Sequence, residues 1–255
     1  MQTFFSDWWY LSIRNVKLIW RPLLALLTAL FMPIFFFVVN SLSLQSFAKV
    51  PGFPDVSYKD FIAPVAIFTA IFFSAGNAGI ELVQDITSGY LKKLVIMPIN
   101  KLAIVLAKLT EVAVQSIIQG VIMLTLLLVW GVEIKSGLLG VLAMFAMLVV
   151  FAMAWSCISM ISALRTQNAR LVQSLFILVF PLLYLTTSQA PKELLPETFA
   201  TLASYNPVTY IIEGIRALVL TGFGDPSIGY GFAAASGMFV VFVTLTVLSF
   251  RKALK

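Results

Sequence analysis

The sequence predicts an all-α integral membrane protein with six transmembrane helices, an N-terminal interfacial amphipathic helix and outer re-entrant helices between spans five and six. Composition is the first reason: 60% of the 255 residues are apolar and 11% are charged, against about 45–50% and about 25% in soluble domains. The second is that six stretches lack Asp, Glu, Lys and Arg and are long enough to cross a bilayer, which takes about 20 residues. We therefore expect a single membrane domain over residues 1–255.

The charge-free windows define the expected spans. They cover residues 22–48, 61–80, 112–132, 136–164, 171–191 and 226–250. Without their polar ends, the spans are expected at 22–40, 61–80, 112–132, 137–163, 171–189 and 228–250. A further window, 198–212, is broken by Asn206-Pro207 and is too short to cross. Pro181 is expected to kink the fifth span.

The basic residues predict the orientation. With the N-terminus inside, 12 of the 17 Lys and Arg residues fall in inner segments and 5 in outer ones. Inner loops of membrane proteins are enriched in Lys and Arg. We therefore expect a multi-pass protein of the cell (inner or plasma) membrane with both termini cytoplasmic. This topology also explains the net charge of +6, so no nucleic-acid partner is expected.

Residues 4–21 are expected to form an amphipathic helix in the headgroup layer, in contact with membrane lipids. The apolar residues recur at steps of three and four, a pattern typical of interfacial helices. The apolar face consists of Phe5, Trp8, Trp9, Ile13, Val16 and Trp20, and the polar face of Asp7, Tyr10, Arg14, Lys17 and Arg21. These charges argue against a cleavable signal peptide, and Pro22 marks the turn into the first span. The helix is either a simple anchor or also a brace for a cytoplasmic partner.

The inner loop 81–101 is too long for a simple turn and too apolar for a solvated loop. Leu91, Leu94 and Val95 form a short helical apolar patch, which Pro98 ends. An exposed patch of this kind is expected to dock against another protein. The alternative is that it packs beneath the protein's own helices.

The outer segment 189–225 contains a second short helix. Asn206 is a good N-cap and Pro207 suits the first helical position, so we expect a helix from Pro207 to Thr221 closed by Gly222. At about 22 Å it can enter the membrane but cannot cross it. We expect a re-entrant pair of helices at the outer end of the pathway; the alternative is a helix lying flat on the surface.

Two polar sets are expected to have roles inside the protein. Glu213 and Arg216 lie three residues apart and are expected to pair as an outer gate, with a charge swap restoring part of the function. Gln115 and Gln119 continue the helix face of Glu111, which lies three residues after Lys108. Buried amides often join helices; a role in the cargo pathway is the alternative. A last set, spaced for close helix packing, is Ser156, Ser159 and Ser162.

Several classes of chemistry are excluded. Without histidine there is no Ser–His or Cys–His nucleophile pair and no His-ligated metal, and Cys157 alone cannot form an intrachain disulfide. No Gly-x-x-x-x-Gly-Lys-Ser/Thr motif occurs, so ATP could be hydrolysed only by a separate chain. We expect no catalytic residue, metal or cofactor on this chain. The charge-free spans favour an apolar or amphipathic cargo, such as a drug, a lipid or a lipid-linked glycan.

These features together resemble the ABC-2 type permeases, the membrane subunits of many ATP-driven exporters. Asp85-x-x-x-Gly89-Tyr90-Leu91-(x)₆-Pro98 is similar to the coupling loop of the family, most closely that of the daunorubicin-type drug exporters. The segment Asn206-Pro207-(x)₈-Arg216-x-Leu218 is similar to a second family motif, before the last span.

The resemblance implies a dimer of permeases, most simply a homodimer, with two copies of an ABC ATPase subunit that carry ATP and Mg. The implied ATPase-coupling residues are Asp85, Gly89, Tyr90, Leu91, Leu94 and Pro98. The implied outer gate consists of Asn206, Pro207, Glu213 and Arg216. Two other classes stay open. One is an intramembrane enzyme, although no pair of Asp residues lies within the expected spans. The other is an ion-coupled secondary transporter, which would need charges within the spans or inverted repeats.

Overall fold

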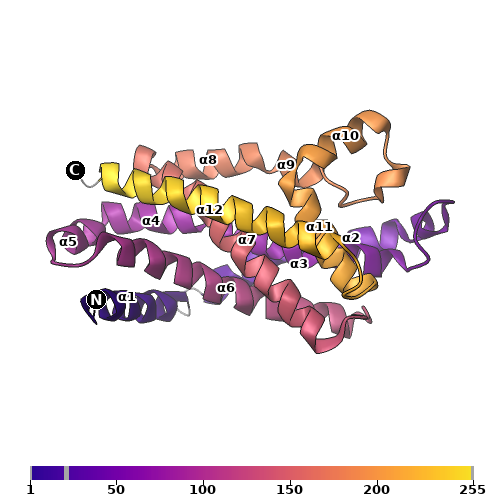
Figure 1. Cartoon of the computed structure of the whole chain (residues 1–255), viewed down its shortest axis with the longest axis horizontal. Coiled ribbons are helices and arrows are strands. Elements are labelled where there is room, and N and C mark those ends of the chain that lie inside the picture. Colours follow the sequence, from indigo (N-terminus) through magenta and orange to yellow (C-terminus); the bar gives the residue numbers. More distant parts are fainter. Residues whose placement is uncertain (1, 20–22, 254–255) are drawn as a thin grey trace.

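The computed structural model in Figure 1 describes residues 2–19 and 23–253 as an elongated helical bundle, and those residues contain no strand. Both chain ends lie at one end of the bundle, here the termini end; the opposite end, with α10 and the connection from α2 to α3, is the distal end. The helices are α1 (Gln2–Ile19), α2 (Leu23–Ser43), η1 (Gln45–Lys49), α3 (Tyr58–Gly76), α4 (Ala78–Thr87), α5 (Tyr90–Ile96), α6 (Lys101–Val129), α7 (Gly137–Thr166), α8 (Ala169–Val179), α9 (Pro181–Tyr184), η2 (Lys192–Leu194), α10 (Glu197–Tyr205), α11 (Pro207–Leu220) and α12 (Ser227–Ala253).

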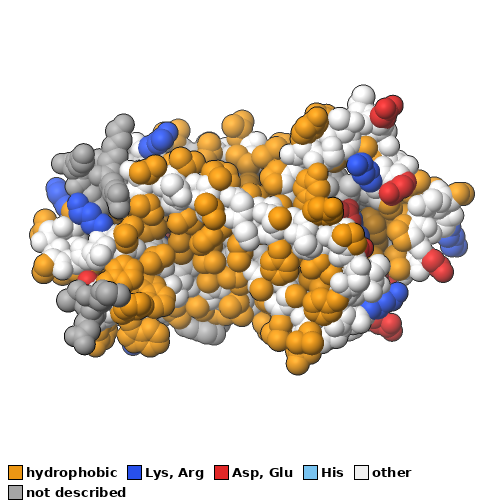
Figure 2. Space-filling model, viewed as in Figure 1, with side chains coloured by type: hydrophobic (Ala, Val, Ile, Leu, Met, Phe, Trp, Pro, Cys, Tyr) orange, Lys and Arg blue, Asp and Glu red, His pale blue; other side chains and the backbone are white. Residues whose placement is uncertain are grey.

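Several helices have the length and composition of membrane spans. Among the described residues, four helical stretches are long and apolar enough to cross, and two shorter apolar helices accompany them. The long stretches are Tyr58–Thr87, Lys101–Val129, Gly137–Thr166 and Ser227–Phe250; the shorter ones are Thr28–Ser43 and Ala169–Tyr184. Figure 2 shows charged side chains gathered at the two ends and a broad apolar middle. The protein is therefore a multi-pass membrane protein, and the count of six spans stays a prediction.

The second and third hydrophobic helices extend beyond their expected bounds. The second continues through α4 to Thr87, and α6 begins at Lys101, where the side chain of Asn100 accepts a hydrogen bond from the Leu102 amide. Most of the expected loop 81–101 is consequently helical, and Pro98 lies in the short link before α6. These longer helices carry charged residues outside the charge-free windows, among them Glu81, Asp85, Lys108 and Glu111.

The fifth hydrophobic helix is shorter than expected. The helix is interrupted at Phe180, directly before Pro181, as the sequence predicts. It then ends at Tyr184, and residues 185–190 are not helical, so the expected span 171–189 is wrong at its distal end. The helical part is shorter than the about 20 residues that a crossing requires. The residues after Tyr184 must therefore be held in place by contacts with other elements.

Helix α1 lies against α6 and confirms the expected N-terminal helix. The indole of Trp8 donates to the hydroxyl of Thr110 at 3.0 Å. Phe5 and Trp9 remain exposed, at 58% and 56%, as expected of rings that contact headgroups. The expected end of this helix, with Trp20, Arg21 and Pro22, lies outside the described residues.

The core is built around α3 and α7. Phe68 packs on Phe151 and Phe72 on Trp155, each pair with ring centroids 4.5 Å apart. Helices α4 and α7 approach closely where the Gly79 amide donates to the Ser159 hydroxyl at 3.1 Å. Ser156 and Ser159 are buried, which confirms close packing at these positions.

Substitution of Gly79 by alanine is expected to destabilise the bundle. A Cβ at residue 79 would lie 2.4 Å from the carbonyl oxygen of Ser159, so the backbones must separate. Overpacking of this kind costs about 1–3 kcal/mol. The matched control is Gly237→Ala on α12, where a Cβ meets no atom within 4 Å. The thermal midpoint of the purified protein should fall for Gly79→Ala only; equal midpoints would contradict the close approach.

Candidate functional site

A buried cluster of charges connects α4 and α6 near the termini end. The Lys108 ammonium lies 2.9 Å from a Glu111 oxygen and 3.0 Å from a Glu81 oxygen. It also lies 4.0 Å from Asp85. Lys108 and Glu111 are only 6% and 4% exposed. Because buried charges are stable only when paired, these ion pairs link α6 to α4.

Arg14 extends this cluster to α1 and α5. Its guanidinium lies 3.8 Å from Asp85 and stacks over the Tyr90 ring at 3.6 Å from the centroid. Burial raises the pKa of the Tyr90 phenol above its ordinary value, so the ring stays neutral and the contact is a cation–π interaction. We call Arg14, Glu81, Asp85, Lys108 and Glu111 the ionic cluster.

Helix α5 begins after a sharp turn at Gly89, whose φ of 74° lies in the left-handed region that favours glycine. Leu91 and Leu94 are buried, at 6% and 5% exposure. The expectation that they form an exposed docking patch is wrong, and the alternative, packing beneath the protein's own helices, is confirmed. Both leucines belong to the hydrophobic core of the bundle, which also contains Leu82 and Val83 of α4.

The opposite side of α5 carries the exposed groups. Ile96 is 83% and Met97 is 45% exposed. Lys92 and Lys93 are exposed as well. We call Lys92, Lys93, Ile96 and Met97 the α5 surface. The sequence analysis did not identify Ile96 and Met97, because it assigned the apolar patch of this short helix to Leu91, Leu94 and Val95.

Asn206 begins α11 as predicted and has a second role that the sequence did not indicate. Its side-chain oxygen accepts from the Val208 amide at 3.0 Å, which is the expected N-cap bond. Its amide nitrogen donates to the Leu182 and Leu185 carbonyl oxygens at 2.7 and 2.9 Å. One side chain therefore caps the start of α11 and the end of α9.

The expected pair of Glu213 and Arg216 is present. Nη1 of Arg216 lies 2.5 Å from Oε1 of Glu213, which also accepts from the Thr187 hydroxyl. Nη2 donates to the Thr187 carbonyl at 2.8 Å, and the guanidinium stacks on Phe61 at 3.9 Å. Eleven of the fourteen residues of α11 are buried, against α3, α7 and α12. Helix α11 is therefore packed inside the bundle, and its re-entrant placement in the membrane stays a prediction.

The two glutamines of α6 differ in their surroundings. Gln119 is 0% exposed, and neither polar atom of its side chain has a hydrogen-bond partner among the described residues. Gln115 is half-buried. The expected joining of helices by these amides is thus not seen for Gln119, and a pathway role stays a prediction.

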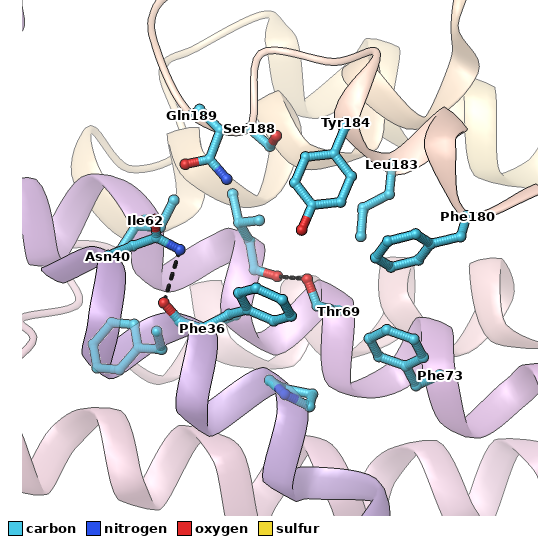
Figure 3. A pocket seen from close by; sticks show the side chains of 14 residues that line it. Phe36, Asn40, Ile62, Thr69, Phe73, Phe180, Leu183, Tyr184, Ser188 and Gln189 are labelled. Atoms are coloured by element: carbon cyan, nitrogen blue, oxygen red, sulfur yellow. Dashed lines mark hydrogen bonds between the residues drawn. The ribbon is translucent and has the colours of Figure 1, made fainter. Parts of the chain in front are cut away.

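A narrow crevice with a cavity volume of about 30 Å³, partly open to the surface, lies between α2, α3 and α9. Figure 3 shows its aromatic side, where the rings of Phe73 and Phe180 lie 5.6 Å apart. The amides of Asn40 and Gln189 lie towards the other side. A space of this size holds about one or two water molecules, so the crevice is too small for a drug-sized ligand in this conformation.

Comparisons with known proteins agree with this architecture. The chain matches the family described as ABC-2 type transporter over residues 6–220. A putative transport permease ycf38 from Porphyra purpurea is 25% identical over 83% of this chain and 77% of its own length. The putative transport permease ycf38 from Cyanophora paradoxa is 26% identical over 64% of this chain. The matched part spans 56% of that relative's length.

A third relative carries a more specific name. The probable doxorubicin resistance ABC transporter permease protein DrrC of Mycobacterium tuberculosis (strain ATCC 25618 / H37Rv) is 22% identical over 91% of this chain and 84% of its own length. The family match includes α5, the ionic cluster and all of α11. The chain therefore belongs to the ABC-2 type transporter family.

Proposed function

We propose that this chain is the permease subunit of an ATP-driven exporter of the cell membrane. Family membership and the relative named for doxorubicin resistance support this assignment. The active unit would be two permeases, most simply a homodimer, with two ATPase subunits that bind ATP and Mg. Both termini would face the cytoplasm, which places the ionic cluster and α5 on the side of ATP.

The observation that carries this proposal is the way α5 is held. Its exposed side presents Ile96 and Met97 to a partner, and its buried leucines and Tyr90 connect it to α4 and α1. A push on α5 by a closing ATPase would be resisted by the ionic cluster and transmitted to α4 and α6. Helix α4 continues the long apolar helix that begins with α3, and α6 is itself long enough to span. A displacement of α5 would therefore move the helices that form the transport pathway.

The cargo is proposed to be apolar or amphipathic: a drug, a lipid or a lipid-linked glycan. The relative named for doxorubicin resistance and the charge-free stretches of the apolar helices support this class. A small hydrated ion would lose several kcal/mol of hydration in an apolar pathway.

The test is capture of the ATPase. The tagged chain, purified from its own membranes, is expected to bring an equimolar P-loop ATPase. The double variant Ile96→Asp with Met97→Asp should lower this capture about tenfold, because two exposed apolar anchors are lost. Val50→Asp, a half-exposed apolar residue at the distal end, is the control and should capture normally. Unchanged capture by the double variant would exclude the α5 surface as the docking site.

The ionic cluster is the one feature that favours the ion-coupled secondary transporter, because charges within spans often mark ion pathways. The two functions differ in energy source. Export that continues after ATP is depleted and stops with a protonophore would support ion coupling. Export that follows ATP and ignores the protonophore would support the permease.

A further inference from the structure

We propose that a pocket at the distal end binds organic cations, an inference that deepens the proposed transport function and depends on it for its biological meaning. The pocket has a cavity volume of about 370 Å³ and lies between α10, α11, α12 and the segment before α3. This is within the size range of small-molecule sites, about 300–1,000 Å³. Its lining includes two carboxylates, two basic side chains and several aromatic rings.

Glu213 presents the negative charge. Its Oε1 atom is occupied by Arg216 and Thr187, whereas no described residue donates to Oε2. The side chain is 34% exposed. A ligand cation could therefore approach Oε2 without displacing any existing bond of the pair.

Arg216 does not offer its positive charge in the same way. Its side chain is only 7% exposed. Its donors are directed to Glu213, to the Thr187 carbonyl and, at 3.4 Å, to the Phe61 carbonyl. An anionic ligand would have to displace one of these acceptors from a buried position, so the pair favours a cation.

Two tyrosines add ring faces. Tyr210 lies one turn before Glu213 on α11, and its ring centroid is 6.5 Å from that of Tyr230 on α12. The Tyr210 hydroxyl donates to the Ser204 carbonyl at 2.8 Å, which fixes this ring. Tyr230 is 62% exposed. Aromatic faces attract cations, most strongly where water is partly excluded.

The remaining charges of the lining largely cancel. Lys192 and Glu193 are neighbours of opposite sign in η2. Their separate effects on a ligand in the pocket therefore offset each other. Because the Arg216 guanidinium is buried and bonded, the group that a ligand meets is the exposed Oε2 side of the Glu213 carboxylate, which favours a lipophilic ammonium or phosphonium.

The experiment measures binding to the full chain in nanodiscs, without an ATPase. Labelled tetraphenylphosphonium is the probe, and tetraphenylborate, of the same shape and opposite charge, is its counterpart. In equilibrium dialysis, Tyr230→Ala should bind the phosphonium about three- to tenfold more weakly. Glu213→Gln should weaken it similarly, and Glu213→Asp should restore part of the loss.

The control is Tyr205→Ala, an 83% exposed tyrosine outside this pocket, which should leave binding unchanged. Phosphonium binding that is equal in wild type and Tyr230→Ala would overturn the proposal, as would preferential binding of the borate at the same residues. Tyr230→Ala remains informative if Glu213→Gln misfolds, because Tyr230 has no part in the Arg216 pair. Failure of ATPase capture with normal phosphonium binding would contradict the proposed function alone.

Discussion

Replacement of Lys108 by methionine is expected to be among the most damaging single changes in this protein. The methionine fills a similar volume but leaves the Glu81, Asp85 and Glu111 carboxylates without their central cation. Removing one partner from a buried ion pair costs about 3–5 kcal/mol. The amount of folded protein extracted from the membrane, and its thermal midpoint, should both fall sharply.

Two further variants separate charge from packing. Glu111 is the most buried of the three acids, so Lys108→Met combined with Glu111→Leu should be more stable than Lys108→Met alone. Lys135→Met, at an exposed lysine of the distal end, should be neutral. A double variant that is less stable than the single one would show that the ionic cluster does not act through charge compensation.

The second large effect is expected at Arg216, and it revises the expected result of a charge swap. The guanidinium is surrounded by acceptors, namely the Phe61 and Thr187 carbonyl oxygens and Glu213. A glutamate at residue 216 would face these carbonyls without a donor of its own. The swap Glu213→Arg with Arg216→Glu should therefore restore nothing, and should be destabilised by several kcal/mol like any unpaired buried charge.

The single substitutions at this pair should be unequal. Arg216→Gln leaves buried acceptors unsatisfied and should lower the thermal midpoint strongly, whereas Glu213→Gln, at a half-exposed carboxylate, should lower it less. Arg216→Lys keeps the charge but loses the planar fork, so an intermediate midpoint is expected. A swap variant as stable as wild type would mean that only the mutual attraction of the two charges matters.

Local sequence signals predicted the elements that depend on local chemistry. The cap at Asn206-Pro207, the interruption before Pro181 and the pairing of Glu213 with Arg216 each follow from neighbours within one helical turn, and the structure contains all three. The end of the fifth hydrophobic helix could not be predicted in this way. The absence of charges, on which the expected span was based, continues to residue 191, whereas the helix ends where Asn206, far along the chain, supplies its cap.

The candidate site was predicted less completely, because it depends on which helix faces contact each other in the folded protein. Periodicity placed Leu91 and Leu94 on one face of a short helix but could not indicate whether that face meets a partner or α4. Likewise, the spacing of Lys108 and Glu111 predicted one contact of the ionic cluster. The contacts with Glu81 and Arg14 join residues that are distant in sequence, and no local pattern carries such information.

The double role of Asn206 limits which residues the chain can accept there. Ser, Thr and Asp are comparable N-caps, but a hydroxyl donates only one hydrogen bond and a carboxylate donates none. Only the short amide can accept from Val208 while donating to both Leu182 and Leu185. Helices α9 and α11 are thereby fastened at a single point, so any outward swing of the end of α9 must carry the beginning of α11 with it.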